Sequence, residues 1–301
     1  MENNGQAGHD RKQVNHWLRG MKMSRPKPNL LIAVAIAAFP LLACLSMGGQ
    51  SNVGSTTQGP ETFSIALNRP LRSGVDAWPS IVAPITPATL RVNETLAALN
   101  RKILIALREC DASYRDWDIA NSTDNPESKA RSRRKVTAEW QRKVTVTMSG
   151  PRFVSFVASD SQFCGGAYPN SDRIALVFDM TTGKPIDWKT FLSEATEADS
   201  ASFVSYDGFM NSGLNMPALV DVAVSNAVED CQKPLADDRT FLVWPDAKRG
   251  ELIVVGVGLP HVVQACEEEI PLTIDQARKL GFREELLEDL ERAHRTAQPR
   301  R

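Results

Sequence analysis

The stretch from Arg152 to Leu192 constrains the fold more than any other part of the chain. Two apolar segments, Phe153–Ala158 and Ile174–Phe178, are rich in β-branched and aromatic residues and predict two strands. Both alternating sets of side chains in the first segment are mostly apolar, so we expect this strand to be covered on both faces. A turn at Asp179–Gly183 and a helix starting after Asp187 are expected to follow.

The connection between these two strands contains two adjacent glycines, Gly165 and Gly166. Glycine tolerates positive φ and lets a neighbouring backbone approach closely. We therefore expect a tight turn here, and the whole stretch predicts an antiparallel strand pair that continues into a helix.

Three motifs in this stretch resemble the extracytoplasmic domain shared by RsiV, a lysozyme-sensing anti-sigma factor, and PdaC, a peptidoglycan deacetylase. They are a glycine-glycine-alanine turn, a strand that ends in aspartate before a Thr-Gly-Lys turn, and a helix that in the family ends in Leu-Phe, where this chain has Phe191-Leu192. The residues that carry the resemblance are Cys164, Gly165, Gly166, Ala167, Tyr168, Pro169, Asp179, Thr182, Gly183, Lys184 and Phe191. The motif match covers about 40 residues, and the domain that it implies would span roughly residues 61 to 280, with lysozyme or peptidoglycan as a ligand. It implies neither sigma-factor binding nor deacetylation, because this chain shows no counterpart of the domains that perform them.

The amino terminus predicts export. Basic residues between positions 19 and 27 precede an uncharged run, Leu30–Met47, that contains Leu41-Leu42-Ala43-Cys44. A basic segment, a short apolar segment and a small residue at the cut are typical of an export signal. The four-residue ending resembles a bacterial lipobox, so we expect Cys44 to be acylated. A single transmembrane anchor over Leu30–Met47 and a plain cleaved signal peptide are the alternatives.

Export divides the chain into three parts. Residues 1–44 are the signal, residues 45–60 are a glycine-rich polar tether, and residues 61–297 form one domain. The part after residue 44 carries 29 Lys/Arg and 34 Asp/Glu, which excludes a globally basic nucleic-acid-binding protein. We expect this domain on the periplasmic side of a bacterial membrane.

Four cysteines remain after Cys44, and an even number in an exported chain predicts disulfide bonds. Four cysteines allow three connectivities. We favour Cys110–Cys164, which would join the segment after the first long helix to the glycine turn. We also favour Cys231–Cys266, which would join a helix end to a strand exit. A zinc site is disfavoured because no Cys-x-x-Cys spacing exists.

The flanking segments complete an α+β pattern. We expect an antiparallel sheet with helices packed mainly on one face, stabilised by the disulfides. A loop rich in serine is expected over residues 199–215. Four helices are expected: Pro87 to about residue 108, Asp187 to about Ala198, Pro217–Cys231, and Leu272 to Ala297. Thr86 should cap the first helix, with Leu90 on its apolar face. Val228 should point inward from the third helix, and Gly281 should break the fourth. The further expected strands are Glu61–Leu67, Val136–Met148, Thr240–Trp244 and Glu251–Leu259.

The sequence offers little catalytic chemistry. Only His261 and His294 follow the signal, and His-Glu-x-x-His, Gly-x-Ser-x-Gly, Walker and dinucleotide-binding patterns are all missing. We therefore predict no catalytic residue, no cofactor and no metal site, and we expect His261 to be a packed, hydrogen-bonded residue.

Charged clusters offer the remaining candidates. Asp160, Asp172 and Asp179 surround the glycine turn and could supply the paired carboxylates of a glycan hydrolase, although Asp179 suits the capping of a turn. The acidic run Glu267–Glu269 and the basic run Lys129–Lys135 suit either charged partners or solvated loops.

Together these patterns predict a binding module of the bacterial envelope, held by a lipid anchor, that contacts a lysozyme-like protein or peptidoglycan. A cell-wall glycan hydrolase and a structural envelope protein without a ligand are the alternatives.

Overall fold

Two large antiparallel sheets, a small β-hairpin and a set of helices make up the chain. A computed structural model describes residues 62–121, 137–204, 210–237, 240–259 and 261–298, which belong to one compact unit, Thr56–Arg301. The expected signal, the tether, Cys44 and the basic run Lys129–Lys135 lie outside these residues. Among the described helices, none has the length and apolar character needed to cross a bilayer.

The strands and helices alternate irregularly along the chain. The strands are β1 (Ser64–Ala66), β2 (Ser80–Ala83), β3 (Glu139–Ser149), β4 (Phe153–Phe163), β5 (Asn170–Asp179), β6 (Lys184–Pro185), β7 (Asp199–Val204), β8 (Met210–Asn215), β9 (Thr240–Asp246), β10 (Glu251–Gly256) and β11 (Ile270–Thr273). The helices are α2 (Pro87–Asn121), α4 (Pro217–Asn226), α5 (Glu229–Asp237), α6 (Ile274–Lys279) and α7 (Glu284–Ala297), with 3-10 helices η1 (Trp188–Phe191) and η2 (His261–Cys266).

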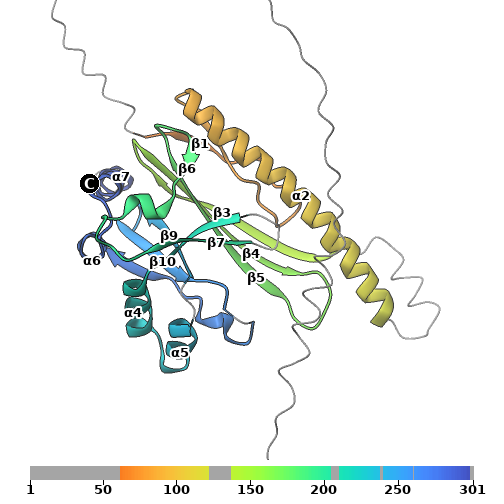
Figure 1. The fold of residues 1–301 in the computed structure, drawn as a ribbon. Coiled ribbons are helices and arrows are strands. Elements are labelled where there is room, and N and C mark those ends of the chain that lie inside the picture. The colour runs from red at the N-terminus through yellow and green to blue at the C-terminus, as the bar shows by residue number, and fades with distance from the viewer. Residues whose placement is uncertain (1–61, 122–136, 205–209, 238–239, 260, 299–301) are drawn as a thin grey trace, which may run out of the picture. The chain divides into compact units, whose positions relative to one another are not determined.

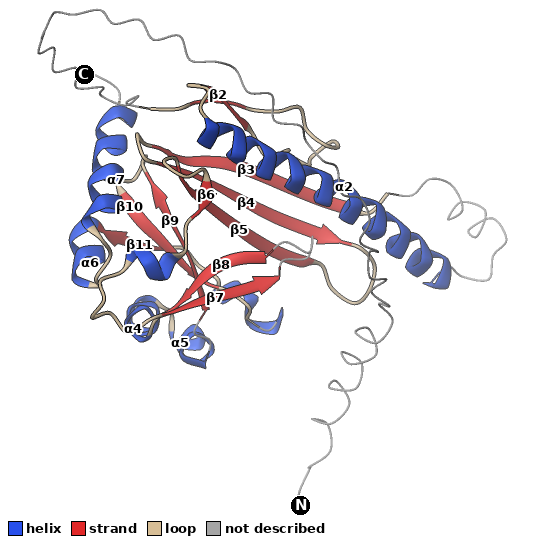
Figure 2. Cartoon of the chain, turned by 45° about the horizontal axis from the view of Figure 1, so that its top comes forward, coloured by secondary structure: helices blue, strands red, loops and turns tan. Residues whose placement is uncertain are grey.

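The two large sheets pack against each other, with helices outside them. One sheet has the order β3-β4-β5-β6 and the other has the order β11-β10-β9-β8-β7. Helix α2 lies across the four-stranded sheet, and α4, α5, α6 and α7 gather around the five-stranded sheet (Figures 1 and 2). This arrangement confirms the α+β class with antiparallel sheets.

Strand β4 is buried on both faces, as its apolar pattern predicts. Phe153 and Val157 belong to the core between the two sheets, whereas Val154 and Phe156 belong to the core under α2. Because successive side chains in a strand point to opposite faces, one strand contributes to both cores. Strand β4 also pairs along its length with β3 and β5.

The segment 199–215, which was expected to be a loop, forms β7 and β8 instead. The two strands pair in continuous register from Asp199↔Asn215 to Val204↔Met210, and Leu214 pairs with Phe241 of β9. The prediction was wrong because backbone pairing with a neighbouring hydrophobic strand extends the sheet here, and a serine-rich sequence carries no signal of that pairing.

Several helices differ in extent from their prediction. Helix α2 continues to Asn121, because Tyr114 and Trp117 extend its buried face beyond Cys110 by one-turn spacing. The helix expected after Asp187 is the single turn η1. The helix expected over residues 217–231 divides into α4 and α5.

Two apolar side chains that were expected to point inward are exposed. Leu90 is 50% exposed and Val228 is 64% exposed. Leu90 lies on the outer side of α2, whose buried stripe runs through Val92, Leu96 and Leu99 instead. Val228 lies between α4 and α5, where the helical spacing assumed for it is interrupted.

Other local predictions are confirmed. Thr86 accepts a hydrogen bond from the amide of Thr89, whose hydroxyl in turn accepts from the amide of Thr86, so the start of α2 is capped in both directions. Gly281 has a φ of 89° between α6 and α7, as expected for a helix break.

Both favoured disulfides are present. Cys110 in α2 is bonded to Cys164 after β4, and Cys231 in α5 is bonded to Cys266 in η2. The first disulfide ties α2 to the far end of the four-stranded sheet, and the second ties the paired helices α4 and α5 to the segment before β11.

Each disulfide is expected to contribute substantially to stability. The bonds join residues 54 and 35 positions apart. The chain-entropy relation then gives a loss of about 4 kcal/mol in the free energy of unfolding for Cys110→Ala/Cys164→Ala, and a similar loss for Cys231→Ala/Cys266→Ala. Urea unfolding followed by tryptophan fluorescence measures both. Free thiols or a crossed pairing in non-reducing peptide mapping of the wild-type chain would contradict this connectivity.

Candidate functional site

The glycine-glycine turn connects β4 to β5 and packs against α2. Gly165 and Gly166 have φ values of 91° and 116°, which glycine adopts without steric cost. A Cβ atom at Gly165 would lie 2.6 Å from the Cβ atom of Trp117, so the contact with α2 requires glycine at this position. The disulfide from Cys164 to Cys110 fixes the same contact covalently.

Aromatic rings surround this turn on one side. Tyr114 and Trp117 of α2 contact Phe163 at the end of β4, with ring centroids 5.8 and 5.2 Å from it. Ala167, Tyr168 and Pro169 continue the turn at the surface. The first part of the motif therefore joins α2 to the end of the sheet.

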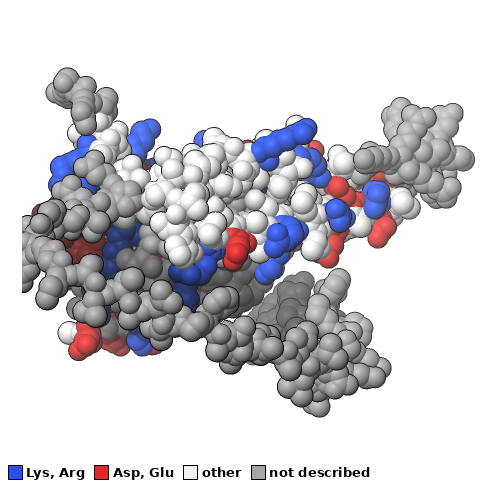
Figure 3. Space-filling model, turned by 90° about the horizontal axis from the view of Figure 1, so that it is seen from above, with Lys and Arg blue, Asp and Glu red and all other residues white. Residues whose placement is uncertain are grey.

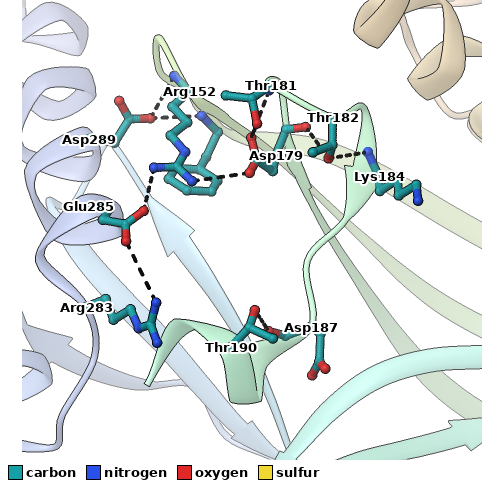
Figure 4. Close-up of polar contacts among 11 residues, drawn as sticks. Arg152, Asp179, Thr181, Thr182, Lys184, Asp187, Thr190, Arg283, Glu285 and Asp289 are labelled. Atoms are coloured by element: carbon teal, nitrogen blue, oxygen red, sulfur yellow. Dashed lines mark hydrogen bonds and ion pairs between the residues drawn. The ribbon is translucent and has the colours of Figure 1, made fainter. Parts of the chain in front are cut away.

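The second part of the motif forms a turn at the opposite end of β5. The carboxylate of Asp179 accepts hydrogen bonds from the amide and the hydroxyl of Thr181 at 2.8 and 2.7 Å (Figure 4). Gly183 has a φ of 69°, and a Cβ atom there would lie 2.4 Å from the backbone oxygen of Ala88. Asp179 thus caps the turn as expected, and Gly183 lets the turn contact the first residues of α2.

The remaining motif residues lead from this turn into η1. The amide of Lys184 donates to the hydroxyl of Thr182 at 3.2 Å. The carboxylate of Asp187 accepts from the amide of Lys189 at 3.2 Å, which confirms Asp187 as the cap of this short helix. Phe191 is buried in the core between the sheets.

Arg152 joins the Asp179 turn to α7. Its guanidinium group contacts the carboxylates of Asp179, at 3.3 Å, and of Glu285 (Figure 4). Arg283 lies on the other side of Glu285, at 4.0 Å. These charges are partly exposed, so water screens their attraction and their contribution to stability is small.

Asp289 of α7 lies fully buried beside Arg152. One of its carboxylate oxygens accepts from the backbone amides of Phe153, at 2.9 Å, and Arg152, at 3.2 Å. Burial raises the pKa of Asp289 above its usual value, although these hydrogen bonds and the contact with Arg292 act in the opposite direction. Asp289 therefore attaches α7 to the start of β4.

The candidate carboxylates separate into two places. Asp160 of β4 and Asp172 of β5 lie directly opposite each other in the register of the sheet. Asp179 lies at the far end of β5, opposite Phe153. The structure therefore brings together the first two carboxylates but not the third.

Asp160 is itself part of a buried polar cluster. Its carboxylate accepts from the indole of Trp140 at 2.9 Å and from the guanidinium group of Arg142 at 2.6 Å, and Arg142 stacks over the ring of Trp78. Both charges are almost fully buried. An ion pair at this depth needs both partners, because removing either one would leave a buried charge uncompensated.

The other sequence candidates lie apart from this cluster. His294 is hydrogen-bonded to the backbone oxygen of Ala247 at 2.7 Å, and His261 begins η2. In the acidic run, Glu269 contacts Arg249 at 2.8 Å and Arg173 at 3.8 Å. Within the described ranges, no three His, Cys, Asp or Glu side chains are grouped as metal ligands.

A cleft of about 900 Å³ runs along β3, and it is the candidate binding site. Residues Arg72–Gly74 lie on one side of it, residues Thr137–Lys143 follow its length, and Ser159–Ser161 of β4 lie on the other side. Segment Arg72–Gly74 is fixed against β3, because the amide of Arg142 donates to the backbone oxygen of Gly74 at 2.8 Å. The walls of the cleft are therefore built before any ligand binds.

The exposed side chains of the cleft are polar. On β3 and β4 they are Glu139, Gln141, Lys143, Ser159 and Ser161. Gln141 lies opposite Ser161, and Lys143 lies opposite Ser159. Hydroxyl, amide and charged groups of both signs thus share one face of the sheet, where they can hydrogen-bond a polar, extended ligand.

Sequence reasoning missed this cleft, although part of its signal is present. Residues 139–143 and 159–161 alternate between polar side chains, which are exposed, and Trp140, Arg142 and Asp160, which are buried. Alternation over a strand identifies a half-exposed sheet face. The approach of Arg72–Gly74 to β3, which gives the cleft its depth, depends on residues that are far apart in the sequence.

Comparison with known proteins assigns no relative. No protein-family model matches the chain, and no curated protein matches it either.

Asp289 generates a prediction about pH. Its pKa is higher in the native than in the unfolded chain, so its contribution to stability is greatest below the ordinary aspartate pKa and decreases as the pH rises through the native pKa. Asp289→Asn remains uncharged, so the free energy of unfolding of this variant should increase relative to wild type as the pH rises above the ordinary aspartate pKa of about 4. Urea unfolding at several pH values measures the difference.

Asp289→Ala serves as the matched comparison. It leaves two buried backbone amides without an acceptor, so it should be about 2–4 kcal/mol less stable than Asp289→Asn at every pH, since neither variant titrates at this position. A pH-independent difference between Asp289→Asn and wild type would contradict the assigned shift.

Proposed function

We propose that the chain is an exported, lipid-anchored binding module of the RsiV/PdaC type that binds peptidoglycan in the cleft along β3. Acylation of Cys44 would hold it on the periplasmic side of the membrane. The observation that supports this proposal most directly is the polar cleft, set in a fold that two disulfides cross-link. Disulfides persist in exported proteins and are rare in the bacterial cytoplasm.

The chemistry of the cleft suits a cell-wall polymer. Peptidoglycan presents sugar hydroxyls, amides, free carboxylates and amines. The exposed serines and Gln141 can hydrogen-bond the hydroxyls and amides, Lys143 can pair with a carboxylate, and Glu139 can pair with an amine. Lysozyme is the second candidate ligand that the family resemblance suggests. A strongly basic protein is less well matched, because the cleft exposes Lys143 beside Glu139 and is not acidic overall.

A binding assay tests the cleft directly. We expect the full chain to co-sediment with insoluble peptidoglycan, and Gln141→Ala/Lys143→Ala to bind about tenfold more weakly, because each truncation removes an exposed contact without opening the core. Lys233→Ala is the matched control: it removes one exposed lysine from α5, remote in sequence and outside the cleft lining. Calorimetry with lysozyme forms a parallel arm. Equal binding by all three proteins would contradict the assignment to the cleft, and no binding to either ligand would contradict the function.

A hydrolase is the second candidate, because Asp160 and Asp172 lie opposite each other. A binding module should produce no cleared band in zymography on cell-wall substrate. A cleared band that Asp172→Asn abolishes, with the fold intact by circular dichroism, would identify the chain as a glycan hydrolase instead. Asp172 is the better position to change because Asp160 also holds Arg142.

A further inference from the structure

Four large apolar side chains are exposed close to where the chain enters the described domain. Leu67, Val82, Ile85 and Leu90 are each at least half exposed, and together they form what we term the apolar patch. They lie at the end of β1, on β2 and at the start of α2. Of the nine large apolar side chains exposed in the described ranges, these four fall within 24 consecutive residues.

Hydrogen bonds fix the elements of the apolar patch side by side. The side chain of Asn93 in α2 both accepts from the amide and donates to the backbone oxygen of Ile81 in β2, at 2.8 and 2.9 Å. Asn68, next to Leu67, donates to the backbone oxygen of Trp78 at 2.7 Å. The apolar patch is therefore a fixed surface and does not depend on a mobile loop.

The segment of the chain that carries the apolar patch is basic, unlike the part of the chain that follows it. Residues 62–110 carry six Lys/Arg and three Asp/Glu, whereas residues 111–301 carry 23 and 30. Figure 3 looks onto this side of the molecule and shows a broad uncharged area, bordered by several lysine and arginine groups and, in places, by acidic groups. The exposed cations in this part of the chain are Arg69, Arg91, Arg101, Lys102 and Arg108.

We infer that this face docks on a bilayer that contains anionic phospholipid. Apolar side chains that enter the headgroup region, bordered by cations that attract anionic lipid, are the two features of a membrane-surface site. The inference rests on the anchor in the proposed function, because only 17 residues separate Cys44 from Thr62. Even fully extended, those residues reach at most about 60 Å, so the bilayer is present at high effective concentration beside β1.

Docking on this face would orient the cleft. Strand β3 contacts the patch side of the molecule through hydrogen bonds of Arg142 with Gly74 and Asp76 and of Ser149 with Phe63. The exposed polar side chains of the cleft lie on the other sheet face, away from α2. A membrane under β1, β2 and α2 would leave that sheet face open to the cell wall.

Hydrogen exchange on anchored protein tests the inference. The full chain is placed through its own anchor in nanodiscs of phosphatidylcholine alone or with phosphatidylglycerol. We expect the amides of residues 64–68 and 81–92 to exchange about tenfold more slowly on the anionic discs. Val82→Ser/Ile85→Ser/Leu90→Ser should lose this protection. Val228→Ser/Val262→Ser, which changes two exposed side chains outside the apolar patch, should keep it.

Each alternative has its own result. Equal exchange in the triple variant and wild type on anionic discs overturns the inference. Protection that appears only at high protein concentration, with or without anionic lipid, also overturns the inference. It would assign the face to a second copy of the chain. Mass spectrometry of Cys44 reports separately on the anchor. If the chain is not anchored, co-sedimentation with phosphatidylglycerol vesicles replaces the discs. A lack of binding to these vesicles would contradict membrane docking and would leave the proposed binding in the cleft unaffected.

Discussion

The burial of β4 on both faces is the constraint on which the rest of the structure depends. Its alternate side chains fill two separate cores, one under α2 and one between the sheets. Apolar surface on both sides of one strand requires two covering layers. Strand β4 is therefore fully buried only when both α2 and the five-stranded sheet pack against it. The two cores are therefore coupled through a single strand.

At each end of β4, specific contacts attach one of the covering layers. At its start, the buried carboxylate of Asp289 binds the backbone amides of Arg152 and Phe153, which attaches α7 to the sheet. At its end, the disulfide at Cys164 and the close contact of Gly165 with Trp117 attach α2. Of the glycine-glycine motif, Cys164 and Gly165 belong to the attachment at the end of β4, so these two residues serve the fold.

The candidate binding surface is a consequence of the same layout. The five-stranded sheet covers β3–β5 where their inward side chains are apolar, such as Met148 and Val177. Where those side chains become polar, from Glu139 to Lys143 and from Ser159 to Ser161, the sheet face is exposed and forms the cleft. The buried pair Arg142–Asp160 supports that half of the sheet from the opposite face and favours one arrangement of the strands that line the cleft.

The sequence by itself determined the features that depend on neighbouring residues. Alternation of apolar side chains predicted β4 and β5, and glycine and aspartate predicted the turns at Gly165 and Gly183. The even number of cysteines, interpreted as those of an exported chain, predicted the disulfides. Tertiary structure alone decided what depends on distant partners: the pairing of β7 with β8, the division of residues 217–231 into two helices, and the closure of the cleft by Arg72–Gly74. These features are stabilised by backbone pairing and packing between segments far apart in the chain, and local side-chain patterns do not encode which segments will meet.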